Sequence, residues 1–440
     1  MRAPSPAPNI PPTAPSGEST AQRPMDIALA GLVALAVAMG IGRFAFTPLL
    51  PMMLHDGLLD LPGASWLASA NYFGYLVGAV LCTLQPWLWA RLRVLPLFAF
   101  VTLVRGGLVA TGLLTLAMAW PAPAAWPVLR FAAGVTSAVV FVYTSGWCMA
   151  RLARLGVPAL SGMIYMGPGA GIVLSGLAAS AMTAWHWRAA AGWVLFGLLA
   201  WVLAASVWRT LRGSEERLHA GAPAAAGQAA GQAGGAALAP PQGRAEMAWL
   251  ALAYGLAGFG YIITATFLPV IARTALPGSA WLDMFWPIFG LGVMGGALLV
   301  SRLPHGGDFR LRLIVCYVLQ AAGVAASLYS PSLAGFVLGS VLLGLPFTAI
   351  TFFAMHEVRR LRPAQAASFI GLLTAVYGVG QILGPALVAL LLRRLPDAAA
   401  GFTLSLEVAA GALLAGALIY AGMVWAYPLK AAAVSGGAQG

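Results

Sequence analysis

Charged residues are scarce in this chain of 440 residues. Asp, Glu, Lys and Arg together make up 8% of it, whereas hydrophobic residues make up 60%. A soluble globular domain carries about 25% charged residues, so this composition cannot cover a folded surface in water. Apolar runs of about 20 residues, each long enough to cross a bilayer as a helix, repeat along the chain. The composition therefore predicts a polytopic membrane protein whose solvent is the lipid bilayer.

Lysine and acidic residues are nearly absent. The chain has one Lys and twelve Asp or Glu, against 23 Arg. A net charge of +12 would by itself suggest a nucleic-acid partner. The arginines, however, lie in brief clusters between apolar runs and form no basic face, so we expect no nucleic-acid binding. Their distribution reports membrane topology instead.

Motifs for metals, cofactors and nucleotides are also missing. The three cysteines lie inside apolar runs without metal-ligand spacing, which excludes a disulfide framework. No Lys-Ser/Thr follows the glycine run at Gly167–Gly171, so it is not a phosphate loop. We expect no metal, no cofactor and no enzymatic activity. The first 24 residues hold seven prolines and no apolar run, so they cannot be a signal peptide.

Twelve apolar runs predict an all-α membrane protein. Ser330, Pro331 and Ser332 alone separate runs 9 and 10, which makes that boundary the least defined. The predicted spans are 27–50, 65–89, 94–120, 126–150, 157–183, 187–210, 247–272, 280–301, 311–329, 332–355, 367–392 and 400–427.

Residues 220–239 differ from the spans, because sixteen of these twenty are Ala or Gly. This composition is typical of a flexible linker, and it divides the membrane part into two six-helix halves. The predicted organisation is a disordered cytoplasmic tail at 1–26, an N-terminal bundle at 27–210, a cytoplasmic linker at 211–246, a C-terminal bundle at 247–428 and a cytoplasmic tail at 429–440.

Basic residues gather in alternate connections between the spans. With the N-terminus in the cytoplasm, seventeen Lys or Arg fall on the cytoplasmic side and four on the other side, while Arg43, Arg105 and Arg130 lie inside spans. Because basic connections stay in the cytoplasm, this bias predicts an even number of spans. It also predicts cytoplasmic termini in a bacterial inner membrane.

The two halves share sequence features. Span 1 reads GIGRFAFTPLLP from Gly40 and span 7 reads GFGYIITATFLP from Gly258, and an offset of 218 also aligns Arg43 with Tyr261. Spans 5 and 11 repeat three glycines at an offset of 209, Gly162, Gly169 and Gly171 with Gly371, Gly378 and Gly380. Internal duplication of this kind is typical of transporters that bind a solute between their halves.

These features resemble the major facilitator superfamily over the whole membrane portion. GIGRFAFTPLLPMM in span 1 and SWLASANYFGYLVGA in span 2 are similar to its YbfB/YjiJ-like branch. The resemblance implies two pseudo-symmetric six-helix bundles and helices 1, 4, 7 and 10 around a central cavity. It also implies transport of a small solute by alternating access, usually driven by protons. The branch implies no substrate.

One departure from the superfamily concerns the connection after span 2. It keeps Arg91 and Arg93 but lacks the Asp of the family's basic motif, whereas the equivalent connection in the second half holds Asp308 and Arg310. The glycine run in span 5 resembles a motif of antiporter branches, which favours efflux over uptake.

We therefore expect a monomeric, proton-coupled antiporter or symporter of a small organic solute. Two alternatives stay open. One is a sensor of the same fold that does not transport. The other is a membrane-embedded transferase, which would need clustered acids or a His with an acidic partner, and the five histidines here are scattered.

Arg43 is the leading candidate for solute binding. A charge inside the bilayer costs about 2.5–3.5 kcal/mol on insertion scales, so each one requires a reason. The planar fork of an arginine pairs with a carboxylate or phosphate, which predicts an anionic or strongly hydrogen-bonding solute. A structural ion pair, or a side chain that snorkels to the interface, is the alternative. Arg130 near the outer end of span 4 is a second candidate, whereas Arg105 is interpreted as structural.

Neutral polar residues complete the predicted site. Asn71 and Tyr75 lie four apart, on one face of span 2. Interhelical hydrogen bonds would explain such residues equally well. The predicted substrate-binding set is Arg43, Asn71, Tyr75, Arg130, Tyr143, Tyr261 and Gln381.

Acidic residues supply two further predictions. Glu407 is the only acid well inside a span, which makes it the candidate for proton coupling. A charged cluster at the cytoplasmic surface predicts a gate made of Arg91, Arg93, Asp308, Arg310, Glu357 and Arg359.

Overall fold

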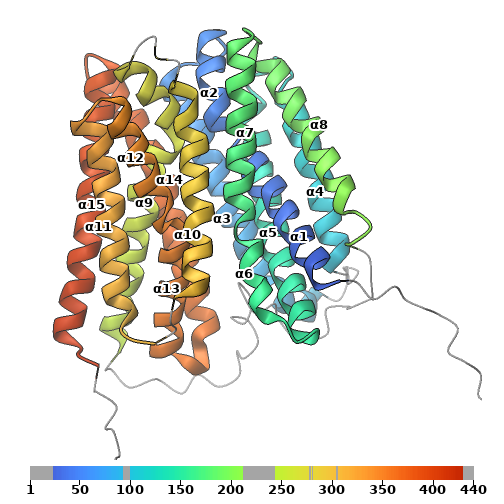
Figure 1. Cartoon of the computed structure of the whole chain (residues 1–440), viewed down its shortest axis with the longest axis vertical. Coiled ribbons are helices and arrows are strands. Elements are labelled where there is room, and N and C mark those ends of the chain that lie inside the picture. Colours follow the sequence, from blue (N-terminus) through green and yellow to red (C-terminus); the bar gives the residue numbers. More distant parts are fainter. Residues whose placement is uncertain are drawn as a thin grey trace, which may run out of the picture.

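The computed structural model describes residues 23–92, 100–211, 243–276, 279, 281–303 and 306–429. Within these residues all regular secondary structure is helical, and twelve segments are long and apolar enough to cross a membrane. Figure 1 shows these helices standing side by side, with the first half (blue to green) beside the second half (yellow to red). The all-α class and the number of spans are confirmed. Arg93, most of the predicted linker and nearly all of both tails lie outside the described residues.

The first half is built from spans 1 to 6. Span 1 consists of α1 (Pro24–Leu35), a π-helical turn (Ala36–Ile41) and α2 (Phe46–His55). The other five spans are α3 (Leu61–Leu92), α4 (Phe100–Ala117), α5 (Trp126–Arg154), α6 with α7 (Ser161–Ile164 and Gly167–Ala184) and α8 (Ala189–Val207).

The second half is built from spans 7 to 12. Ser332 caps the first turn of span 10 by accepting a hydrogen bond from the amide of Gly335, so the short turn at residues 330–332 does separate two spans. The helices are α9 (Arg244–Ala275), α10 (Phe285–Arg302), α11 (Phe309–Tyr329), α12 with α13 (Leu333–Gly344 and Pro346–Leu361), α14 (Ala366–Arg394) and α15 (Ala398–Ala426).

Span 1 is longer than predicted and is broken in the middle. The sequence predicted one run at 27–50, whereas the helices extend from Pro24 to His55. The amides of Gly42 and Phe44 bond to carbonyls five residues back, which widens the turn before α2 begins. π-Helical turns of this kind are frequent at functional sites.

Glycines explain why this break is tolerated. A Cβ atom added at Gly171 of α7 would lie 2.6 Å from the Cα of Gly40, so the two backbones touch at the π-helical turn. In the second half, a Cβ atom at Gly380 of α14 would lie 2.7 Å from the amide nitrogen of Phe259 in α9. Equivalent spans therefore pack backbone to backbone in both halves, although α9 itself stays continuous.

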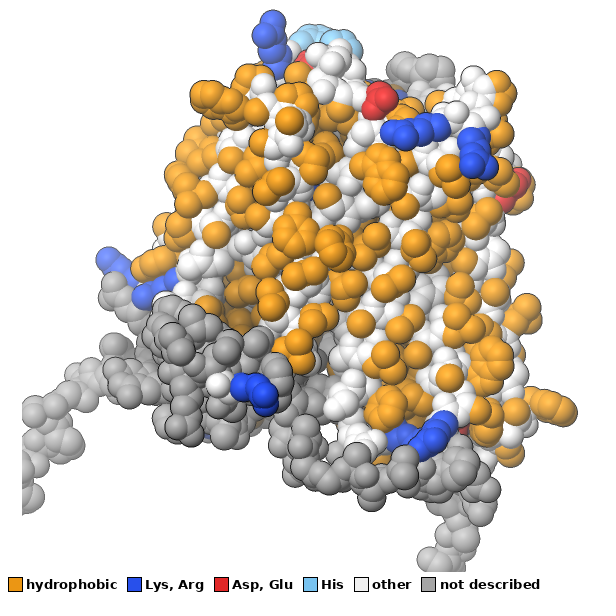
Figure 2. Space-filling view, turned by 180° about the vertical axis from the view of Figure 1, so that it is seen from behind, with side chains coloured by type: hydrophobic (Ala, Val, Ile, Leu, Met, Phe, Trp, Pro, Cys, Tyr) orange, Lys and Arg blue, Asp and Glu red, His pale blue; other side chains and the backbone are white. Residues whose placement is uncertain are grey.

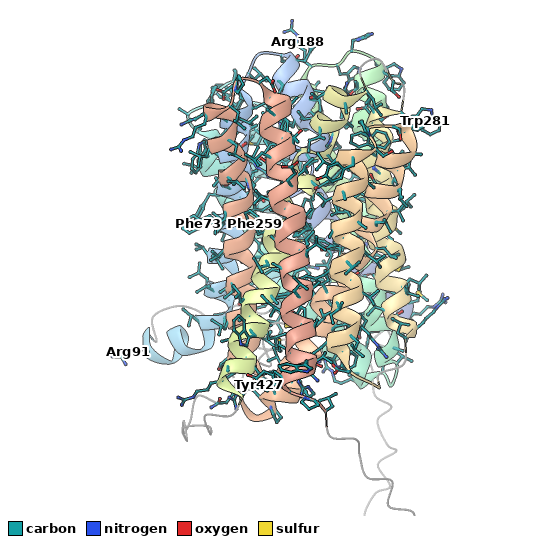
Figure 3. All side chains as sticks on the ribbon, turned by 90° about the vertical axis from the view of Figure 1, so that its left-hand side faces the viewer. Phe73, Arg91, Arg188, Phe259, Trp281 and Tyr427 are labelled. Carbon is teal, nitrogen blue, oxygen red and sulfur yellow. The ribbon has the colours of Figure 1, made fainter. Side chains whose placement is uncertain are left out.

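Polar and apolar surfaces are segregated along the bundle. Hydrophobic side chains cover the middle of the face in Figure 2, while Lys and Arg lie near its two ends. We call the end where α8 ends and α9 begins the linker end, and the opposite end the far end. Figure 3 shows Arg91 and Tyr427 at the linker end and Arg188 at the far end. This arrangement is that of a multi-pass membrane protein.

The two halves meet mainly along three helix pairs. α2 packs against α9, α3 against α14 and α7 against α10, while α1 packs on helices of its own half. The far-end part of span 1 is thus the part that reaches the second half. This contact brings the break in span 1 next to α9.

Candidate functional site

Arg43 lies in the turn that follows the π-helical segment, at the boundary between the halves. Its side chain is only 3% exposed. Nη2 donates a hydrogen bond of 2.7 Å to Oε1 of Gln381 in α14, and Nε2 of Gln381 donates to the hydroxyl of Tyr261 in α9. The structure therefore joins three of the predicted site residues, from both halves, in one buried chain of hydrogen bonds.

Aromatic rings surround the guanidinium group of Arg43. Its Cζ lies 4.1 Å from the ring centroid of Tyr75, 5.0 Å from that of Tyr72 and 5.3 Å from that of Phe44. Such cation–π contacts stabilise the charge without neutralising it. Nε of Arg43 has no hydrogen-bond partner, and no acid in the described part of the chain forms an ion pair with this residue. The cluster is positively charged, and one of its donors, Nε of Arg43, lacks an acceptor.

Arg130 supports the break in span 1. It is 2% exposed, so its side chain is enclosed by the protein. From α5 it donates to the carbonyl oxygens of Gly42 (3.4 Å) and Arg43 (3.0 Å), and its guanidinium lies 4.9 Å from the ring of Phe46. Ser137 of the same helix donates to the carbonyl of Ala38 at 2.7 Å. These bonds satisfy carbonyls that the irregular turn leaves free, and they hold the backbone of Arg43 in place.

Asn71 is directed at α5. Its Nδ2 donates to the carbonyl oxygen of Arg130 at 2.8 Å, and the residue is fully buried. A Cβ atom at Gly74, one turn further along α3, would collide with the carbonyl of Phe131. Asn71 therefore ties together two closely packed helices, which is the interhelical role that the sequence left open. Direct contact of Asn71 or Arg130 with a solute stays a prediction.

Two other predicted residues are not brought to Arg43. Tyr143 follows Arg130 by thirteen residues in α5, which is about 20 Å along a helix, and its ring packs on Phe100 at 5.5 Å. Glu407 is exposed on the perimeter of α15. Proton coupling through Glu407 remains an untested prediction, and its position separates it from the cluster at Arg43.

Several residues of the cluster were missed by the sequence analysis. Tyr72 donates to or accepts from Thr266 of α9 at 2.9 Å. Tyr377 stacks on Tyr261 at 5.8 Å between ring centroids, and it lies one helical turn before Gln381. That spacing of four was a usable signal. Tyr72 offered a comparable signal, because Ser69 and Tyr75 lie three residues before and after it in span 2.

The predicted gate cluster holds one half together. Arg310 is fully buried and bonds to Asp308, to Glu246 of α9 and to the last carbonyls of α15. Arg360 bonds to Glu246 at 2.6 Å and to Glu357 at 2.8 Å. The partner of Glu357 is thus Arg360, the residue after the predicted Arg359, and Glu246 was missed. These ion pairs connect helices of the second half, and the role of the cluster as a gate stays a prediction.

Asp308 is the acid of this cluster that lies outside the spans. It caps α11 by accepting a hydrogen bond of 2.9 Å from the amide of Arg310. Burial alone would raise the pKa of Asp308, but the hydrogen bonds from the side chain and backbone of Arg310 outweigh burial and hold the pKa below its usual range.

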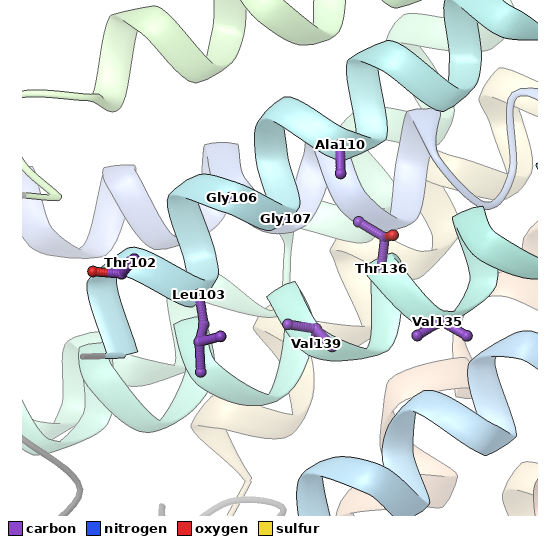
Figure 4. A pocket seen from close by; sticks show the side chains of 8 residues that line it. All are labelled: Thr102, Leu103, Gly106, Gly107, Ala110, Val135, Thr136 and Val139. Carbon is purple, nitrogen blue, oxygen red and sulfur yellow. The ribbon is translucent and has the colours of Figure 1, made fainter. Parts of the chain in front are cut away.

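A groove on the perimeter offers no comparable chemistry. It lies between residues 102–110 of α4 and 135–139 of α5 and has a volume of about 290 Å³ (Figure 4). Apart from the hydroxyls of Thr102 and Thr136, only apolar or glycine residues line it, without a charge. Orientation of a polar solute requires convergent polar groups. The cluster at Arg43 is therefore the better candidate site.

Comparison with known proteins agrees with this arrangement. The profile of the family described as the uncharacterised MFS-type transporter YbfB matches residues 35–421. The chain belongs to this family. A search of curated proteins gave no match to this MFS transporter.

Solved structures show the same fold at low sequence identity. The nucleoside transporter NupG has a TM-score of 0.65 and 17% identity, with 92% of this chain and 99% of NupG covered. A D-xylose–proton symporter has a TM-score of 0.66 and 12% identity, with 90% and 97% covered. The human organic anion transporter TETRAN has a TM-score of 0.54 and 17% identity, with 91% and 100% covered. The fold and the family together identify a transporter of the MFS type.

Proposed function

We propose that this MFS transporter carries a small organic anion across the bacterial inner membrane by alternating access, and that the anion binds Arg43. The buried guanidinium group of Arg43, which has no acidic partner among the described residues, carries the proposal. An uncompensated charge in a medium of low dielectric constant is costly, and an anionic ligand removes that cost. A carboxylate also supplies acceptors for in-plane N–H groups.

The hydrogen-bond geometry leaves a donor of Arg43 unused for such a ligand. Arg43 has five N–H donors, of which Nη2 is used by Gln381 and Nε by none. Gln381 is neutral, so an anion can compete with it for the guanidinium. Because Gln381 belongs to the other half, a ligand that takes its place changes an interaction between the halves. Solute binding would then alter the balance between conformations, as alternating access requires.

The hydrogen bonds between the halves support one conformation. Besides Arg43 with Gln381, hydrogen bonds between described residues join the halves at Tyr72 with Thr266, Thr47 with the carbonyl of Ala265, and Ser69 with the carbonyl of Ile382. All of these hydrogen bonds lie at the far end or midway between the far end and the linker end. If the arginine bias sets the linker end in the cytoplasm, this conformation is closed to the outside, and the opposite step must break these bonds.

Proton coupling is the second part of the proposal. Glu407 is exposed on the perimeter, whereas a carboxylate solute can itself carry a proton. A pH gradient would then drive flux without an acid in the binding site. Carriage of the proton by the solute corresponds to uptake along an inward proton gradient. Efflux, which the glycine run of α7 alone favours, would instead require exchange of the anion for a proton that moves inward.

The test is flux in proteoliposomes. Proteoliposomes that contain the purified protein would be loaded with labelled carboxylates from a panel. The flux of each carboxylate would be compared between the wild type and Arg43→Gln. Arg105→Gln is the matched control, because Arg105 is also an intramembrane arginine but donates to the carbonyl of Trp208 at 2.6 Å. We expect flux to fall at least tenfold in Arg43→Gln alone. Equal flux in both variants would exclude Arg43 from the site, and no carboxylate flux in the wild type would exclude the proposed function.

A further inference from the structure

The side chains around Arg43 indicate which class of organic anion the protein binds. This inference rests on the proposed function. We propose that the solute is an aromatic carboxylate. Its carboxylate binds the guanidinium of Arg43, and its ring packs against the partly exposed faces of Tyr75 and Tyr377.

Aromatic side chains form a continuous wall on the second-half side of Arg43. Tyr254 packs on Tyr377 at 4.7 Å between ring centroids, Tyr377 on Tyr261 at 5.8 Å, and Tyr261 on Phe347 at 5.1 Å. Phe347 continues to Phe289 at 6.4 Å. These rings come from α9, α10, α13 and α14, so the wall spans four helices of one half. Arg43 is bonded to the middle of it through Gln381.

The rings differ in how far they are covered. Tyr72 and Tyr261 are buried, whereas Tyr75, Phe347 and Tyr377 are only half-buried. Tyr75 is also the ring closest to the guanidinium, at 4.1 Å. A solute that reaches Arg43 therefore meets free aromatic surface beside the charge. Aromatic rings prefer offset or edge-to-face contact with one another, and such a pair is worth roughly two- to twelve-fold in a binding constant beyond its buried area.

Two buried polar atoms without a partner, at Arg43 and at the neighbouring Trp286, are nitrogen donors. Nε of Arg43 and Nε1 of Trp286 are both buried without an acceptor. Trp286 packs on Phe44, which in turn contacts the guanidinium of Arg43. Buried donors require acceptors, and an unpaired one is destabilising. A ligand rich in acceptors and poor in donors satisfies them, which a carboxylate does and an amine does not.

A polyhydroxylated anion fits this surface less well than an aromatic one. The side chains with exposed area next to Arg43 offer ring faces, which do not replace the hydrogen bonds that sugar hydroxyls make in water. Leaving such hydroxyls unpaired costs binding energy. A compact anion without a ring would leave the aromatic faces uncovered. A negative charge and a planar aromatic ring together therefore distinguish the expected solute from these other anions.

Four probes separate these two properties. Benzoate has both the ring and the charge, cyclohexanecarboxylate has the charge without the aromatic ring, benzamide has the ring without the charge, and acetate has the charge alone. Binding to the full-length protein in detergent would be measured by calorimetry at neutral pH. We expect benzoate to bind at least fivefold more tightly than cyclohexanecarboxylate, and benzamide and acetate to bind at least a hundredfold more weakly than benzoate.

Variants assign the preference to a residue. Tyr75→Leu should abolish the advantage of benzoate over cyclohexanecarboxylate, and Tyr75→Phe should keep it. Phe73→Leu is the matched control, because Phe73 lies two residues away on α3 and is 50% exposed on the perimeter (Figure 3). It should bind benzoate as the wild type does. The four probes on the wild type decide the question even if Tyr75→Leu fails to fold.

The outcomes distinguish this inference from the proposed function. Equal affinity for benzoate and cyclohexanecarboxylate would overturn the aromatic class and leave an organic anion as the solute. Equal affinity for benzoate and benzamide would contradict the role of charge. Binding of neither carboxylate at millimolar concentration would overturn both proposals.

Discussion

Arg43 and Tyr261 occupy equivalent positions in the two halves, and both bind the side-chain amide of Gln381. Arg43 donates to its oxygen and Tyr261 accepts from its nitrogen. One residue of α14 thus bridges the two copies of the duplicated segment. A charged group from one half and a hydroxyl from the other are held in one network, at the place where a solute between the halves would bind.

Arg130 should act as a positioning residue for this network. Arg130→Gln leaves the carbonyls of Gly42 and Arg43 without a charged donor, which costs roughly 1–3 kcal/mol. We expect a lower melting temperature in detergent together with weaker carboxylate binding. Arg130→Lys should recover part of the stability, because it keeps a donor at the end of the side chain. Unchanged melting and binding in Arg130→Gln would contradict this role.

The contact of Gly171 with Gly40 should not tolerate a methyl group. Gly171→Ala would place Cβ 2.6 Å from the Cα of Gly40, and overpacking of this kind costs about 1–3 kcal/mol. Gly411→Ala is the matched control, since nothing lies within 4 Å of its added Cβ. Alanine favours a helix over glycine by roughly 1 kcal/mol, so thermal unfolding should show the first variant destabilised and the second unchanged or stabilised. The reverse order would contradict the packing.

The hydrogen bond between Tyr72 and Thr266 should hold the far end closed. Thr266→Val removes it, and a loss of about 1 kcal/mol raises the population of the open far end roughly fivefold. Spin labels at positions 55 and 394, in place of His55 and Arg394, would report the change by electron paramagnetic resonance as a longer distance between the two labels. Thr274→Val is the control, because that hydroxyl bonds within α9 to the carbonyl of Val270. A shift of equal size in both variants would exclude a specific closing role.

Glu407 should not carry the coupling proton. Its exposed position on α15 is separate from the cluster at Arg43. We expect Glu407→Gln to keep the response of carboxylate flux to an imposed pH gradient in proteoliposomes. If the variant still transports but no longer responds to the gradient, Glu407 is the proton carrier and our account of coupling is wrong.

Asp308 should contribute to stability in a pH-dependent way. Its pKa is lower in the folded protein than the usual value of about 3.9. The stabilisation is therefore fully present above about pH 4 and is lost as the pH falls through the folded pKa. Asp308→Asn keeps a capping side chain but removes the charge beside Arg310. Its melting temperature should lie below that of the wild type at neutral pH, and the difference should shrink below about pH 4. A difference independent of pH would contradict the ion pair.

The spans could be predicted because the thickness of the bilayer sets their length and the lipid acyl chains require apolar side chains. Arg43 stood out for the same reason, since a charge in hydrocarbon requires an explanation. The internal repeat also aligns it with Tyr261 on sequence alone. What periodicity does not show is which partner a side chain meets. Asn71 was therefore grouped with Tyr75, although its amide binds the backbone of α5.

The break in span 1 and the ion pairs of the second half were harder to predict. Gly40 and Gly42 suggested close packing, but a π-helical turn depends on the carbonyl bonds that Arg130 and Ser137 make from another helix. Glu246 begins α9 next to the linker, and its pairing with Arg310 and Arg360 depends on how three helices meet. Such tertiary contacts leave no periodic trace in the sequence.

The most direct test is to locate a bound anion. Crystals of the protein grown with 4-bromobenzoate would be measured at the bromine absorption edge, where the anomalous signal marks the ring. We predict the carboxylate within hydrogen-bonding distance of Nε of Arg43 and the bromine beside Tyr75 and Tyr377. A single saturating site elsewhere, with Arg43 still bonded only to Gln381, would contradict the account.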